Sequence, residues 1–119
     1  MAISFAKRKF TASTGGRGIT LGTGSTTIHD PLTGTIATGD FDEVWMWASN
    51  IDTVPIEVTV EFGGTTAAGD NIILTIPPKS GLVQLVPGFL ISGNNNVTAK
   101  AGTASKINVF GFVNLIVES

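Results

Sequence analysis

The chain has 119 residues and no cysteine, which fits one domain and excludes disulfides, a thiol nucleophile and cysteine-based metal sites. A formal net charge of −2 and a pI near 5.1 argue against a general nucleic-acid binder. No stretch approaches the roughly 20 apolar residues that cross a bilayer, so we expect no membrane partner. Only 13% of residues are charged, about half of the roughly 25% in an average soluble domain. Much of the surface is therefore uncharged, and extended apolar surface on a small protein usually marks a site where another protein docks.

The N-terminal segment carries the sharpest charge asymmetry of the chain. The run Lys7-Arg8-Lys9 follows a short apolar start, Arg17 comes next, and no acidic residue precedes Asp30. These cations fit either a solvated terminal strand or an arm that becomes ordered on an acidic partner surface. A secretory signal has the opposite order of charge and apolar residues, so we expect synthesis in a cytoplasm.

Two short motifs between positions 29 and 43 contain residue types that occur in catalytic or metal-binding sites. A catalytic interpretation of His29 would let Asp30 orient the ring, but adjacent strand residues point to opposite faces. A structural or solvated histidine is therefore favoured. The acidic cluster of Asp40, Asp42 and Glu43 could contribute oxygen ligands to calcium, but the EF-hand pattern is absent. Turn-forming aspartates before a strand are the favoured interpretation.

Residues 43–51 alternate in the manner of a strand, with Val44 on one face and both tryptophans on the other. Because Trp45 and Trp47 share a face, they could stack on sugar rings in a carbohydrate-binding module. The competing interpretation places both rings in the core or under a neighbouring subunit.

The other expected strands are short and bounded by glycine, proline or asparagine turns. They cover residues 18–23, 25–30, 54–62, 71–76, 82–86, 89–91, 97–101 and 107–117. The last is apolar on both sides, with Val109 and Val113 on one side and Phe110 and Phe112 on the other. Such a strand is either covered by two layers or exposed to a partner.

No segment shows a sustained helical period, so little or no helix is expected. The pattern predicts an all-β fold, a β-sandwich of jelly-roll type, with a Greek-key β-barrel as the alternative. We expect one domain over residues 1–119, with residues 1–17 as a candidate N-terminal arm. No catalytic, cofactor-binding or metal-binding residues are assigned, and an enzyme is not expected.

Four stretches of the chain resemble small virion proteins of tailed bacteriophages. The resemblance covers about residues 42–116 and rests on strand-and-turn pattern rather than on a catalytic signature. Its stretches are Asp42-Glu43-Val44-Trp45-Met46-Trp47-Ala48-Ser49-Asn50, Glu57-Val58-Thr59-Val60-Glu61-Phe62-Gly63-Gly64, Ile76-Pro77-Pro78-Lys79-Ser80-Gly81-Leu82-Val83-Gln84-Leu85-Val86-Pro87-Gly88 and Ile107-Asn108-Val109-Phe110-Gly111-Phe112-Val113-Asn114.

The resemblance implies a head decoration, or cement, protein of jelly-roll type that binds the outside of an assembled capsid. The expected partners are a phage major capsid protein and further copies of the chain, as a dimer or trimer. The expected location is the capsid exterior of the virion, after synthesis in a bacterial cytoplasm. Another virion component (tail, baseplate or head–tail fitting) and a carbohydrate-binding module on a fibre remain alternatives. The candidate partner-binding residues are Lys7, Arg8, Lys9, Arg17, Trp45, Trp47, Phe110 and Phe112.

Overall fold

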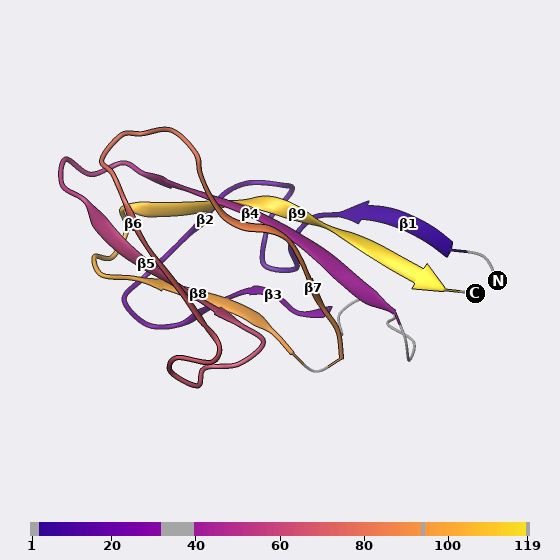
Figure 1. Ribbon diagram of the computed structural model, residues 1–119. Coiled ribbons are helices and arrows are strands. Elements are labelled where there is room, and N and C mark those ends of the chain that lie inside the picture. The colour runs from indigo at the N-terminus through magenta and orange to yellow at the C-terminus, as the bar shows by residue number, and fades with distance from the viewer. Residues whose placement is uncertain (1–2, 32–39, 94, 119) are drawn as a thin grey trace.

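Two antiparallel β-sheets packed face to face make up the protein, as the computed structural model shows (Figure 1). The structure describes residues 3–31, 40–93 and 95–118. The expected all-β sandwich is confirmed. The strands are β1 (Ile3–Arg8), β2 (Ile19–Thr20), β3 (Thr26–His29), β4 (Phe41–Asn50), β5 (Ile56–Phe62), β6 (Asn71–Ile76), β7 (Val83–Ile91), β8 (Val97–Ala101) and β9 (Ile107–Glu118).

The order of the strands is that of a jelly roll. Sheet A runs β1-β9-β4-β7, with β2 also paired to β9, and sheet B runs β3-β8-β5-β6. From β2 onward the chain passes to the other sheet at every connection except β5 to β6. The resulting orders, β2-β9-β4-β7 and β3-β8-β5-β6, are the two four-stranded sheets of that fold.

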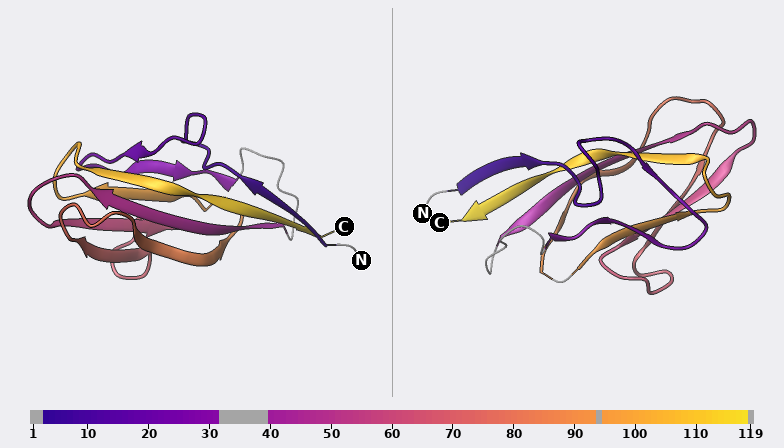
Figure 2. Two further views of the ribbon diagram at one scale, coloured as in Figure 1. Left: turned by 90° about the horizontal axis from the view of Figure 1, so that it is seen from above. Right: turned by 180° about the vertical axis from the view of Figure 1, so that it is seen from behind.

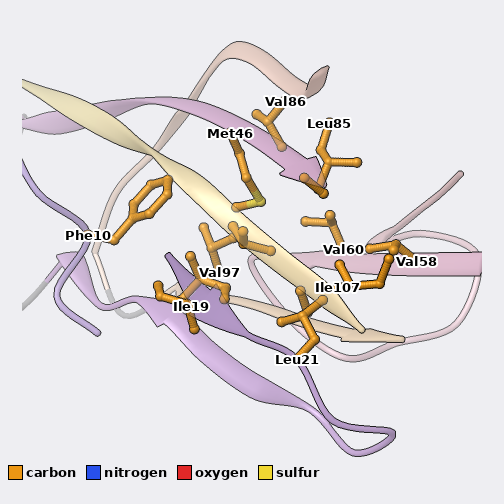
Figure 3. Close-up of a cluster of buried hydrophobic side chains, with 14 of the residues drawn as sticks. Phe10, Ile19, Leu21, Met46, Val58, Val60, Leu85, Val86, Val97 and Ile107 are labelled. Carbon is orange, nitrogen blue, oxygen red and sulfur yellow. The ribbon is translucent and has the colours of Figure 1, made fainter. Parts of the chain in front are cut away.

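Alternation along the strands supplies the core between the sheets. In β4, Val44, Met46 and Ala48 are buried, and the residues between them lie on the outer face of sheet A. Figure 3 shows Met46 of this strand in one cluster with side chains of sheet B, such as Val60 and Val97. The buried hydrophobic residues are Phe10, Ile19, Leu21, Ile28, Val44, Met46, Ala48, Ile56, Val58, Val60, Ile76, Leu85, Val86, Ile91, Val97, Ala99, Ala101, Ile107, Val109 and Val113.

One expected boundary was wrong. Pro87-Gly88 was expected to separate two strands, yet β7 is continuous from Val83 to Ile91. Proline is tolerated at the edge of a sheet, and β7 is the last strand of sheet A. The pairing with β4 shifts register between Val44 and Trp45, opposite this point, which accommodates the irregular backbone.

The N-terminal segment lies in the sheet in this structure. Strand β1 pairs with β9 from Ile3 opposite Glu118 to Arg8 opposite Val113, and Phe10 just beyond it is buried in the core. Figures 1 and 2 show β1 and the end of β9 extending together from one end of the sandwich. The candidate arm over residues 1–17 stays a prediction about the assembled state.

Strand β9 needs glycine at one position where three segments converge. Gly111 has φ +154°, and a Cβ there would lie 2.1 Å from the carbonyl oxygen of Trp45 and 2.8 Å from the ring of Phe10. The absent side chain therefore lets β9 approach β4 while Phe10 fills the core beneath.

We expect Gly111→Ala to lower the free energy of unfolding by about 3 kcal/mol or more, because backbone strain and a clash with a rigid carbonyl act together. Denaturant unfolding measures this. The control is Gly24→Ala, where a Cβ meets open space, with an expected change below about 0.5 kcal/mol. Equal stability of the two variants would contradict the packing described for β9.

Candidate functional site

The outer face of sheet A carries four aromatic side chains in two cross-strand pairs. Trp45 on β4 lies opposite Phe112 on β9, and Trp47 lies opposite Phe110. Ring centroids of Trp45 and Trp47 are 6.4 Å apart, and that of Phe112 is 6.5 Å from Trp45 and 6.1 Å from Trp47. Phe110 is 36% exposed and the other three rings are half-buried. These four residues are called the aromatic face below.

A row of polar side chains borders the aromatic face. The Trp45 Nε1–H donates to Glu43 Oε1 at 2.7 Å, and Asn114 Nδ2 donates to the same oxygen at 3.0 Å. These two hydrogen bonds, the Trp45 bond first, lower the pKa of Glu43 below its ordinary value. On the neighbouring strand, Lys7 Nζ lies 4.5 Å from the centroid of the Phe112 ring, a cation–π contact. The row therefore orients the rings rather than merely flanking them.

Beyond this row the face becomes apolar again. Phe5, Ile116 and Phe41 lie side by side on β1, β9 and β4, in register and on the same side as Lys7, Asn114 and Glu43. Phe5 is 71% exposed, which is the largest value among the exposed large hydrophobic residues described. The apolar surface of sheet A therefore reaches from the aromatic face to the β1 end of the molecule.

Positive charge gathers at the β1–β2 side of the same face. Lys7, Lys9 and Arg17 are all exposed. A Cβ at Gly16 would lie 3.9 Å from Cδ of Lys9, and one at Gly18 would lie 2.7 Å from the Phe110 ring. Gly16 and Gly18, the two neighbours of Arg17 in the chain, therefore lie beside Lys9 and the Phe110 ring, respectively.

The outer face of sheet B has a different character. On strand β5, Glu57, Thr59 and Glu61 lie on the outer side of the sheet, and the residues between them are in the core. Of these three, Glu57 is exposed, whereas Thr59 and Glu61 are only 7% and 3% exposed. Glu61 Oε1 accepts hydrogen bonds from Ser25 and Thr98, and the pKa of Glu61 is lowered chiefly by the Ser25 bond. One outer face of the sandwich is thus aromatic and the other is polar.

Arg8 lies apart from the other predicted partner-binding cations. Its guanidinium lies 3.4 Å from Asp42 Oδ2, and His29 Nε2 lies 2.6 Å from the same oxygen. His29 and Asp42 are both fully buried. The Thr11 backbone N–H donates to His29 Nδ1 at 3.3 Å, so Nδ1 carries the lone pair and Nε2–H donates to the carboxylate.

This buried cluster argues against a catalytic pair of His29 and Asp30 and against a calcium site at Asp40, Asp42 and Glu43. The partner of His29 is Asp42 rather than the adjacent Asp30, and the ring is sealed from solvent. Asp42 points inward as part of β4, not as a turn residue, while its neighbour Glu43 points outward. Among the described residues, no group of three His, Cys, Asp or Glu side chains lies together as a metal site.

Sequence reasoning found the aromatic face but missed its borders. Glu43 was considered only as a calcium ligand, and Asn114, Phe5, Phe41 and Ile116 were not selected. The alternation that placed Trp45 and Trp47 on one face also places Phe41 and Glu43 there. Phe5, Asn114 and Ile116 join this face through the register of β1 against β9, which no local sequence pattern reveals.

No family model, curated protein or solved structure matches the chain. In the part of the chain that the structure describes, no helix is long and apolar enough to cross a membrane.

We expect Asp42→Ala to lower the free energy of unfolding by about 3 kcal/mol, because it leaves Arg8 and buried His29 without their shared acceptor. Urea denaturation followed by circular dichroism measures the loss. Glu57→Ala removes an exposed carboxylate from β5 and is expected to change stability by less than about 0.5 kcal/mol. A small effect of Asp42→Ala would show that the cluster does not hold β1, β3 and β4 together.

Acid is expected to release Trp45 from Glu43. Because the pKa of Glu43 is lowered by accepting these hydrogen bonds, the bonds are complete above its ordinary value of 4.5 and are lost as pH falls through the lower folded value. In an NMR titration the Trp45 Nε1–H resonance should move with a midpoint below 4.5, whereas that of Trp47 should not follow it. Glu43→Gln should abolish the transition; its persistence would assign it to another group.

Proposed function

We propose that this chain is a head decoration, or cement, protein of a tailed bacteriophage that binds the outer capsid surface and stabilises neighbouring capsid subunits. The observation that carries the proposal is the difference between the two outer faces. Sheet A presents four aromatic rings with the exposed Lys7 over one of them, whereas the outer side of β5 in sheet B carries Glu57, Thr59 and Glu61, of which only Glu57 is exposed. Such a difference supports docking by the aromatic face of sheet A.

The aromatic face suits protein docking because its rings are already ordered. Trp45 packs against both Trp47 and Phe112 and is held by Glu43, so little side-chain freedom is lost when a partner covers it. Large aromatic side chains dominate the binding energy of protein interfaces. The cations at the border add attraction to an acidic partner surface and direct its approach.

Reinforcement of a shell follows from linkage. A protein that binds the assembled lattice but not its dissociated subunits shifts the equilibrium toward the lattice. Contacts of modest strength suffice when several copies act as one oligomer, because each bound copy raises the effective concentration of the next. We therefore propose that the chain acts as a homo-oligomer, a dimer or trimer, on the major capsid protein.

A carbohydrate-binding module on a fibre is the second candidate, favoured by the adjacent Trp45 and Trp47 rings. Sugar sites combine such rings with polar groups that bind hydroxyls. At the aromatic face the nearest carboxylate oxygen, Glu43 Oε1, already accepts two hydrogen bonds from within the chain. This occupancy favours a protein partner over a sugar. Another virion location, such as the tail or baseplate, would use the same face.

The test is to add purified chain to heads of the encoding phage that lack it and to image them by cryo-electron microscopy. We expect the wild-type chain to occupy regular exterior sites with sheet A against the shell. Phe110→Lys should reduce occupancy at limiting concentration at least tenfold, the equivalent of about 1.4 kcal/mol, since it places an unpaired charge in the contact.

The matched control is Glu57→Lys, which changes an exposed residue on the outer face of sheet B and should leave occupancy unchanged. Equal binding by Phe110→Lys would contradict docking through the aromatic face. Location on the tail, or binding of glycans with a change in tryptophan fluorescence and none of heads, would replace the proposal with one of the two alternatives.

A further inference from the structure

Strand β6 is the last strand of sheet B and differs from the other edges of the sandwich. It pairs with β5 over six residues, from Ile56 opposite Ile76 to Glu61 opposite Asn71, without a shift in register. No charged residue occurs between Asp70 and Lys79. A regular, uncharged edge strand is a template for pairing with another strand.

The other outer strands carry the features that normally prevent such pairing. Strand β7 contains Pro87 and two register shifts against β4. Strand β3 spans four residues and has a register shift against β8, and β2 spans two. Strand β1 includes Lys7 and Arg8. Among the described strands, β6 alone combines full length, regular pairing and absence of charge.

The side chains of β6 are apolar on both faces of the sheet. Ile72 and Leu74 pack against the core, whereas Ile73 lies opposite Thr59 on the outer face and is 57% exposed. Ile73 is thus an exposed aliphatic side chain at the edge of the outer face of sheet B. A strand added beside β6 would cover it and would satisfy the outward-pointing backbone groups of the edge.

We propose that β6 pairs with β6 of a second copy of this chain, antiparallel and about a two-fold axis at Ile73, so that sheet B continues through both copies. This assigns a surface to the homo-oligomer of the proposed function, and it rests on that function in no other respect. Pairing of this kind uses the same edge on both copies and therefore stops at a dimer.

Register and charge both favour the second copy as the occupant. With Ile73 opposite Ile73 and Ile72 opposite Leu74, outer side chains meet outer ones and inner side chains meet inner ones. A slip of one residue would set an outer side chain against an inner one. The antiparallel arrangement also brings the Asp70 end of one copy beside the Lys79 end of the other. In that register Asp70 of one copy lies opposite Ile76 of the other, three residues before its Lys79. The nearest charges at each end of the two paired strands are therefore of opposite sign.

The first experiment is sedimentation of the purified full chain without any capsid, so its outcome is independent of shell binding. We expect a species of twice the 12.3 kDa monomer mass. Ile73→Lys should raise the dimer dissociation constant at least tenfold, because two like charges would face each other across the axis. Ile51→Lys is the matched control, since Ile51 is also an isoleucine, is 55% exposed and lies outside β6; it should leave the dimer intact.

The second experiment tests the register in a chain that has no native cysteine. Directly opposed residues of an antiparallel pair have Cα atoms about 4.5–5.5 Å apart, within disulfide range, so Ile73→Cys should form a covalent dimer under mild oxidation. Thr75→Cys places the two sulfurs about 13 Å apart along the strands and should not cross-link.

Three results would overturn the pairing. They are a wild-type chain that sediments as a monomer, a dimer that Ile73→Lys and Ile51→Lys affect alike, and cross-linking of Thr75→Cys as readily as Ile73→Cys. The cysteine variants keep the proposal falsifiable if Ile73→Lys fails to fold. If aromatic-face variants lose shell binding but still dimerise, the result bears on docking through the aromatic face and leaves the pairing of β6 unaffected.

Discussion

The rest of the structure depends on the pairing of β9 along both of its edges. On one side it pairs with ten residues of β4, and on the other with β1 and β2. Its side chains are apolar in both directions, with Val109 and Val113 in the core and Phe110 and Phe112 outside. The described chain supplies a second sheet for only one of these directions. Strand β9 is apolar on both sides, but sheet B covers only its inner side. The aromatic face is the apolar side that no second sheet of the described chain covers.

The polar groups around this face make it ordered rather than merely apolar. Glu43 holds the Trp45 indole, and Lys7 lies over the Phe112 ring. Because Trp45, Trp47 and Phe112 also contact one another, these three rings keep one arrangement without a partner. A preformed surface of this kind binds with a smaller entropy loss than one that must order on contact, which is why sheet A supports the proposed docking role better than the threonine-rich remainder.

The buried polar cluster on the inner side of sheet A has a structural role. Arg8 from β1, His29 from β3 and Asp42 from β4 meet at one carboxylate oxygen, which joins the terminal strand and both sheets. A buried charged group requires partners in fixed positions, so the cluster restricts how β1 lies against the sandwich more than apolar contacts alone would. The cluster also explains why Arg8 differs from Lys7 and Lys9, although the three are consecutive in the chain.

The sequence by itself determined most of the strands, the two faces of β4 and β9, and the all-β sandwich, because alternation with period two is a local property. Trp45 with Trp47 and Phe110 with Phe112 were correctly grouped for that reason. Only the tertiary structure decided that Asp42 meets His29, that Lys7 lies on Phe112, and that Pro87 lies inside an edge strand. Each of these depends on which strands become neighbours and in what register. Contacts between residues far apart in the chain set both, and no local pattern of residues encodes them.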